Sequence, residues 1–174
     1  EWAIGAIVNG DSKRIQKFLV FYGAPGTGKS TVLNIINDLF HGYTAPFESK
    51  TLGSSNAQFA LEPFKDNPLV GIQHDGDLSK IEDNTRINSL VAHEVMSVNT
   101  KYGKLYATAF RTFLFMGTNK PVRISDSRSG LLRRLIDVSP TGNKLSYKEY
   151  TRLMKLIPFE LGHIAYHCKE VYES

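Results

Sequence analysis

The stretch FLVFYGAPGTGKST (residues 18–31) decides the fold. Its first five residues are apolar throughout, as expected of a strand covered on both faces of a parallel sheet. The next eight, Gly23 to Ser30, match the pattern G-x-x-x-x-G-K-[ST] of a phosphate-binding loop, the Walker A motif. A helical pattern from Lys29 to Phe40 completes the strand–loop–helix context that the motif requires. We therefore expect an α/β domain that binds nucleotide phosphates.

Each residue type in this loop has a physical role. Glycines let the backbone curl so that successive N–H groups converge on phosphate oxygens, and the helix that follows adds the positive end of its dipole. Lys29 is expected to reach the β- and γ-phosphates, and the Ser30 hydroxyl to ligate Mg²⁺. The expected ligands are ATP and Mg²⁺. The expected nucleotide-binding residues are Gly23, Ala24, Pro25, Gly26, Thr27, Gly28, Lys29, Ser30 and Thr31.

The rest of the chain alternates between apolar runs and helical patterns. Strands are predicted at Phe18–Tyr22, Leu69–Ile72, Thr112–Met116 and Leu135–Val138, and helices at Lys29–Phe40, Ser55–Phe64 and Ile81–His93. Such alternation is typical of a doubly wound α/β fold with a parallel sheet. Ser97–Phe110 reads as a β-hairpin with a basic tip. Ser146–Tyr172 has helical spacing that we expect to be interrupted near Pro158.

Length and composition restrict the class of protein. The chain has 174 residues, 41% of them hydrophobic, which suits one globular domain with a real core. No apolar run is long enough for a membrane span, and Trp2–Val8 reads as the tail of a helix rather than a signal sequence. The single cysteine, Cys168, cannot form a disulfide within the chain and fits a reducing compartment such as the cytoplasm. The chain opens on Glu1, so we expect it to be cut from a longer protein.

The positive charge is concentrated in one segment. Between Val98 and Arg134 the sequence has eight basic residues and one acidic residue, a net charge of +7 against +4 for the whole chain. The basic residues are Lys101, Lys104, Arg111, Lys120, Arg123, Arg128, Arg133 and Arg134, opposed by Asp126. This distribution suggests a polyanion partner, although a solvated basic face explains the charge equally well.

Polar residues follow two of the predicted strands. The first strand leads into His74, Asp75, Gly76 and Asp77. Asp75 stands where a phosphate loop needs a carboxylate to hold Mg²⁺, and Asp77 is a candidate for orienting or deprotonating the attacking water. Asp-Gly is also ordinary turn material, which is the alternative reading for both carboxylates.

The strand at Thr112–Met116 leads to Asn119, at the sheet edge where ligands of α/β proteins bind. There the amide could hydrogen-bond the γ-phosphate and the attacking water, although Asn before Lys-Pro also makes an ordinary turn. Arg133 and Arg134 precede the last strand. One of them could reach a neighbouring subunit's nucleotide and neutralise charge in the transition state, or both could be surface arginines.

Taken together, these motifs resemble superfamily 3 helicases. The resemblance rests on the order of the phosphate loop, the acidic segment at residues 74–77, the basic hairpin, the segment 113–121 and the segment 130–134. It spans about Lys17 to Val138 and is nearest to the phage and plasmid branch, in which a primase module precedes the ATPase domain. That branch implies the cytoplasm of a bacterial host.

The resemblance implies an AAA+-like P-loop core, a hexameric ring with ATP between subunits, and 3′-to-5′ movement on single-stranded DNA. It implies that Asn119 is a sensor, that Arg133 or Arg134 is an arginine finger, and that Lys101 and Lys104 form a DNA-tracking hairpin. The Asp-Gly-Asp spacing departs from the adjacent acidic residues usual at this site.

By this reading, residues 1–16 end an upstream helical region, residues 17–140 form the ATPase core and residues 141–174 form a C-terminal helical segment. Two other functions stay open. The chain could be a small P-loop kinase, with Arg128, Arg133 and Arg134 clamping an acceptor phosphate, or an ATP-gated assembly module that binds DNA without unwinding it.

Overall fold

Strands and helices alternate along the chain, as the sequence predicts. The computed structural model describes residues 1–122, 124 and 130–174. Its elements are α1 (Trp2–Val8), α2 (Ser12–Ile15), β1 (Phe18–Tyr22), α3 (Lys29–Leu39), β2 (Thr44–Pro46), α4 (Ser49–Leu52), η1 (Glu62–Phe64), β3 (Val70–Gln73), η2 (Leu78–Lys80), α5 (Thr85–Val91), β4 (Val95–Val98), β5 (Tyr106–Ala109), β6 (Phe113–Thr118), α6 (Leu131–Arg134), β7 (Leu135–Val138) and α7 (Tyr147–Glu173), where η marks a 3₁₀ helix.

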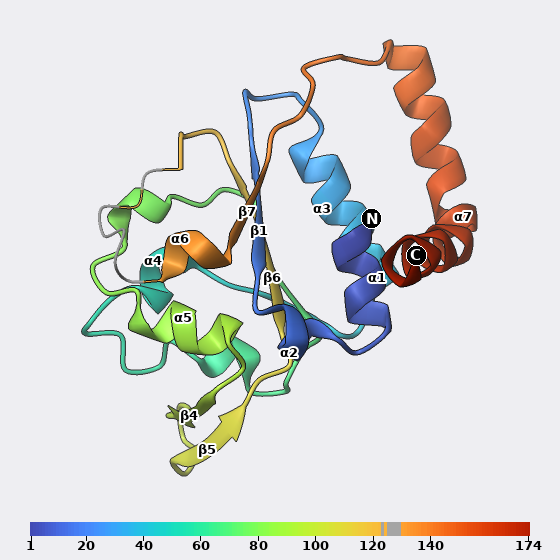
Figure 1. Ribbon diagram of the computed structural model, residues 1–174. Coiled ribbons are helices and arrows are strands. Elements are labelled where there is room, and N and C mark those ends of the chain that lie inside the picture. Colours follow the sequence, from blue (N-terminus) through green and yellow to red (C-terminus); the bar gives the residue numbers. More distant parts are fainter. Residues whose placement is uncertain (123, 125–129) are drawn as a thin grey trace.

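A parallel sheet lies at the centre of the molecule (Figure 1). Within the described residues it has five strands in the order β2-β3-β6-β1-β7, and every neighbouring pair is parallel. All six residues of β6 are buried, because β6 is flanked by β3 and β1 and covered on both faces. The predicted α/β architecture with a parallel sheet and a C-terminal helix is confirmed.

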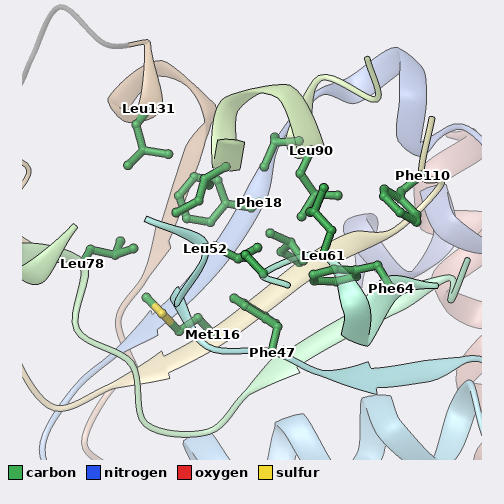
Figure 2. Close-up of a cluster of buried hydrophobic side chains, with 14 of the residues drawn as sticks. Phe18, Phe47, Leu52, Leu61, Phe64, Leu78, Leu90, Phe110, Met116 and Leu131 are labelled. Carbon is green, nitrogen blue, oxygen red and sulfur yellow. The ribbon is translucent and has the colours of Figure 1, made fainter. Parts of the chain in front are cut away.

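Alternate residues of β6 supply two separate cores. Leu114 and Met116 face the side covered by α4, α5 and α6, where they join the cluster shown in Figure 2. Phe113 and Phe115 face the other side and pack with Leu33 and Ile36 of α3 and with Ala3 and Ile7 of α1. The period of two along a strand sends successive side chains to opposite faces. The sheet is therefore held from both sides.

The predicted helix at Ser55–Phe64 is wrong. The structure has turns there and ends in the short 3₁₀ helix η1. Pro63 cannot occupy a helix interior, and Ser and Asn side chains favour turns. The carbonyls of Leu52 and Ser54 accept hydrogen bonds from Arg86 Nη1 at 2.8 and 3.1 Å, which fixes the start of the segment in a non-helical path.

The helix predicted at Ile81–His93 is shorter, because it begins only at Thr85. Asp83 Oδ1 accepts hydrogen bonds from the Thr85 backbone N–H at 2.8 Å and from its hydroxyl at 2.6 Å, which makes a turn before the helix. Ile81 instead packs against Gly53. The strand β2 and the helix α4 were not predicted.

The predicted hairpin is present. β4 and β5 pair antiparallel with Val95 opposite Ala109 and Val98 opposite Tyr106. Only Val98 of β4 is buried, so the pair stands on the edge of the core rather than in it. Figure 1 shows the hairpin at the end of the molecule away from the β1–α3 connection.

The C-terminal helix α7 continues across Pro158, so the expected interruption is wrong, although Figure 1 shows the helix changing direction along its length. It begins with a capping box between Ser146 and Glu149. Its last part packs on α1 near Trp2, and Tyr172 donates a hydrogen bond to Asp11 Oδ2 at 2.8 Å. Although α7 is 27 residues long, none of the described helices is apolar enough over a sufficient length to cross a bilayer.

Gly5 sets how closely α1 and α7 approach. A Cβ at Gly5 would meet the backbone carbonyl of Cys168 and would lie 2.7 Å from Tyr172 Cβ. Gly5→Ala should therefore lower the free energy of unfolding, by about 1–3 kcal/mol, measured by urea denaturation. Gly162→Ala is the matched control, because a Cβ there meets nothing within 4 Å. We expect it to be neutral or to stabilise α7 by up to about 1 kcal/mol. Equal effects of the two changes would contradict this account of the helix contact.

Candidate nucleotide-binding site

The loop between β1 and α3 has the backbone geometry that its glycines predict. Gly26 and Gly28 have φ angles of +76° and +90°, in the left-handed region that favours glycine. Gly28 is the N-cap of the 11-residue helix α3, and its carbonyl accepts a hydrogen bond from the Val32 N–H at 3.0 Å. The loop thus wraps around the amino end of a helix, which is an arrangement suited to an anion.

The Lys29 ammonium is buried within this loop. Lys29 is 8% exposed, and its Nζ donates hydrogen bonds to the carbonyls of Gly23 at 2.7 Å and Ala24 at 2.8 Å. Both acceptors are neutral, and no described carboxylate forms an ion pair with Lys29. A buried charge with neutral partners alone is costly, so the loop is complementary to an anionic ligand.

Three strand ends meet beside the loop. The N–H of Gly23, after β1, donates to the carbonyl of Thr118 at 3.2 Å. The N–H of Gly76, after β3, donates to the carbonyl of Gly117 at 2.8 Å. Because β6 lies between β1 and β3 and adjacent strands are about 4.8 Å apart, the phosphate loop and the acidic segment are about 10 Å apart at one edge of the sheet.

The glycine between the two aspartates is required by packing. Gly76 is buried, and a Cβ there would clash with Met116 Sδ and lie 2.7 Å from Met116 Cγ. The departure from adjacent acidic residues therefore has a local cause. The segment after β3 approaches β6 closely, and a side chain at position 76 would require the buried Met116 side chain to move.

The structure gives Asp77 a well-defined set of partners. Its Oδ2 pairs with Lys120 Nζ at 2.9 Å, and its Oδ1 accepts a hydrogen bond from the Ser79 N–H at 3.1 Å at the start of η2. Hydrogen bonds from the Ser79 side chain and then from Lys120 lower the pKa of Asp77 to about 2. Such a carboxylate is a weak base at neutral pH, so it is better suited to position Lys120 than to accept a proton.

Asp75 differs from Asp77 because its carboxylate is exposed and makes no side-chain hydrogen bond within the described residues. Asn119 and Ser30 are likewise exposed, at the end of β6 and in the first turn of α3. All three lie at the same edge of the sheet as the phosphate loop. The structure therefore places the loop, Ser30, Asp75 and Asn119 at one edge of the sheet.

Arg133 and Arg134 lie at the opposite edge. Leu135, which follows them, is opposite Phe18 at the start of β1, whereas the phosphate loop begins after Tyr22. Five residues of strand separate the two positions by about 16 Å. Lys17 donates a hydrogen bond to the carbonyl of Arg133, and Arg134 Nη1 donates to the carbonyl of Gly130 at 3.2 Å. Arg123, Asp126 and Arg128 lie outside the described residues.

The basic hairpin tip projects into solvent. Lys101 and Lys104 are exposed, and Tyr102 between them is fully exposed, with a φ of +61°. Neither Tyr102 nor Tyr106 is buried in the core. Tyr106 is 38% exposed. The tip therefore offers two cations and two accessible aromatic rings.

Sequence reasoning missed two lysines near the loop. Lys120 directly follows Asn119, so the same strand-end argument that selected Asn119 would have selected it. Lys144 lies far along the sequence, and no local pattern points to it. Its Nζ lies 3.7 Å from the position that a Cβ on Gly26 would occupy.

Removing the charge of Asp77 tests its role. The pKa of this carboxyl is lowered in the folded state from 3.8 to about 2, so its contribution to stability is fully present above pH 3.8 and lost as the pH falls toward 2. Asp77→Asn should therefore be less stable than the wild type at pH 7, with a difference that shrinks over that interval. Asp75→Asn, measured by the same urea titrations, is the control. A difference for Asp77→Asn that is independent of pH would contradict the assignment.

Comparisons with known proteins show the fold and the family of the chain. Three solved structures of the C-terminal region of NrS-1, titled as apo structures, superpose with TM-scores of 0.68, 0.65 and 0.63 at 18%, 16% and 18% identity. The alignments cover 94%, 92% and 90% of this chain and 40%, 40% and 38% of those chains, so it spans about two fifths of their length. At this identity the likeness shows a shared fold.

The comparison with curated proteins found no match. A family model described as a family of unknown function (DUF5906) matches residues 21–134, which run from the end of β1 through the phosphate loop, the acidic segment and the hairpin to α6. The match covers more than half of the sequence, and the chain therefore belongs to the DUF5906 family.

Proposed function

We propose that this chain is the ATPase motor of a DNA helicase, with a P-loop NTPase core of the superfamily 3 type. The observation that carries the proposal is the buried Lys29 ammonium, whose hydrogen-bond acceptors are the carbonyls of Gly23 and Ala24 and, at 3.5 Å, the Thr27 hydroxyl, all neutral, in a loop that wraps the amino end of α3. A triphosphate supplies the negative charge that this arrangement lacks. The order of motifs that resembles superfamily 3, and the fold shared with the NrS-1 C-terminal region, support the same reading.

The residues at the loop edge have distinct roles in the proposed reaction. Lys29 binds the β- and γ-phosphates, and Asn119 orients the attacking water beside the γ-phosphate. The Ser30 hydroxyl and the Asp75 carboxylate would hold Mg²⁺, because this ion prefers oxygen ligands and needs only one or two of them from the protein. When bound, Mg²⁺ neutralises charge on the β- and γ-oxygens. Asp75 is a better candidate than Asp77 for the carboxylate that holds Mg²⁺, because Asp77 already contacts Ser79 and Lys120.

The position of the arginines favours a shared site. Arg133 and Arg134 lie about 16 Å from the loop of their own chain, measured along the strand direction. That distance is too long for either guanidinium to reach the loop. An arginine presented at one edge can instead serve the loop of the next copy in a ring, where it stabilises the transition state of phosphoryl transfer. Such a head-to-tail contact closes into a ring when the rotation between copies permits.

The same geometry weighs against a small-molecule kinase. In the kinase hypothesis Arg133 and Arg134 help to clamp the acceptor phosphate next to the phosphate loop, but both lie at the opposite edge of the sheet. Arg128 lies outside the described residues. An assembly module that binds DNA without unwinding it shares every feature described above. An assay of DNA strand separation distinguishes it from a helicase.

Mixed assemblies test the shared site. Arg133→Ala/Arg134→Ala removes the finger but keeps the loop, whereas Lys29→Ala removes the loop lysine but keeps the finger. The arginine variant alone should lose at least about 10³-fold in ATP hydrolysis, the magnitude typical of an arginine finger. Lys29→Ala alone should also lose activity, because it removes the cation that binds the phosphates. A mixture should recover part of the activity, because some interfaces then pair an intact loop with an intact arginine. The wild-type rate per subunit should rise with protein concentration and with added single-stranded DNA.

The control for this experiment is the wild type alone over the same range of dilution. A rate per subunit that is independent of concentration, together with no recovery in the mixture, would refute the shared site and favour a monomeric enzyme.

Charge removal tests the hairpin. Lys101→Ala/Lys104→Ala should weaken binding to single-stranded DNA and reduce the slope of log K against log salt concentration by about 1.4, since each phosphate contact on a single strand contributes about 0.7. Binding is measured by fluorescence anisotropy between low and moderate salt. Lys148→Ala/Arg152→Ala on α7 removes the same charge from exposed residues and is the matched control. An equal loss in both variants would assign the effect to net charge rather than to the hairpin.

A further inference from the structure

The connection between β7 and α7 lies against the phosphate loop along its length. Pro140 Cδ lies 3.1 Å from the Cβ position of Gly23, at the start of the loop. Lys144 Nζ lies 3.7 Å from the Cβ position of Gly26, in the middle. The Tyr150 hydroxyl lies 3.3 Å from Thr31 Oγ1, at the end. We call residues 139–146 together with Tyr150 the strap.

The register of the sheet explains why the strap passes here. β7 is parallel to β1, and Val138 at its end is opposite Phe21, so the chain leaves β7 at the edge where the loop begins. Gly142 has a φ of +80°, a conformation that favours glycine within the turn that follows. The capping box of Ser146 and Glu149 then starts α7 at a defined residue. The strap is therefore held at both ends.

Lys144 is the cation that the strap brings to the loop. Its side chain is exposed and forms no ion pair within the described residues. Glu149, the nearest carboxylate in sequence, is occupied, because its Oε2 accepts hydrogen bonds from the Ser146 N–H at 3.1 Å and from the Ser146 hydroxyl at 2.7 Å. These hydrogen bonds lower the pKa of Glu149, so it remains ionised within the cap. Lys144 keeps its charge available toward Gly26.

We infer that Lys144 is a second phosphate-binding lysine of the site, supplied by the same chain as the loop. Lys29 approaches from within the loop, at the carbonyls of Gly23 and Ala24, whereas Lys144 approaches from the strap, at Gly26. A polyphosphate seated on the loop would then contact ammonium groups from two elements. A contact between an ammonium and a phosphate is a charge-assisted hydrogen bond, stronger than a neutral one. This inference rests on the proposed function, because it concerns the same site.

The experiment compares binding of two probes, MgATP and inorganic tripolyphosphate, by isothermal titration calorimetry at moderate salt. Lys144→Ala should weaken both about tenfold or more, and Lys144→Arg should restore most of the affinity because it keeps the charge. Lys148→Ala is the matched control. Lys148 is the next cation along the chain, and its side chain makes no hydrogen bond or ion pair within the described residues, so we expect a change of less than about twofold.

The outcomes separate this inference from the proposed function. A wild type that binds neither probe refutes the nucleotide site itself. If the wild type binds both probes and Lys144→Ala binds them equally tightly, the inference is refuted but the nucleotide site is not. Equal losses in Lys144→Ala and Lys148→Ala refute it as well, because they indicate net charge. If Lys144→Ala binds MgATP more weakly but binds tripolyphosphate as tightly as the wild type does, Lys144 lies at the nucleoside rather than at the phosphates. That result also overturns the inference.

Discussion

Two backbone hydrogen bonds at one edge of the sheet are the contacts on which the site depends. Gly23 and Gly76 donate their N–H groups to the carbonyls of Thr118 and Gly117, so the segments after β1 and β3 are both joined to β6. Parallel pairing alone would bring the strand ends to one edge, but it would not fix the loops that follow. With these bonds in place, the phosphate loop, Asp75 and Asn119 have a common frame.

The sheet also separates two groups of charge. The loop and the strap lysine lie at the carboxyl edge, whereas α6 and the hairpin tip lie elsewhere on the molecule (Figure 1). In a single chain these groups do not meet. In the ring that we propose, they would become neighbours across an interface and around a central channel, and one fold would link ATP hydrolysis to contact with DNA. The separation of the two charged groups therefore supports the proposed assembly as much as the geometry of the site does.

The sequence predicted those parts of the structure that local patterns determine. β1 and β7 have the predicted bounds, because continuous apolar runs have few other uses, and the phosphate loop follows from its glycines. The helix predicted at residues 55–64 failed because Arg86, distant in sequence, holds the carbonyls before it. The ion pair of Asp77 with Lys120 and the approach of Lys144 to the loop are likewise tertiary contacts, and no spacing along the chain reveals them.

The pairing of α1 with α7 has a practical consequence. Trp2 is the single tryptophan of the chain, and its ring centroid lies 5.6 Å from that of Tyr172 near the end of α7. Indole emission depends on the surroundings of the ring, so intrinsic fluorescence reports whether the two terminal helices stay docked. The strap leads into α7, and Tyr150 lies in that helix. The same signal therefore tests, without an attached dye, whether adding nucleotide moves α7.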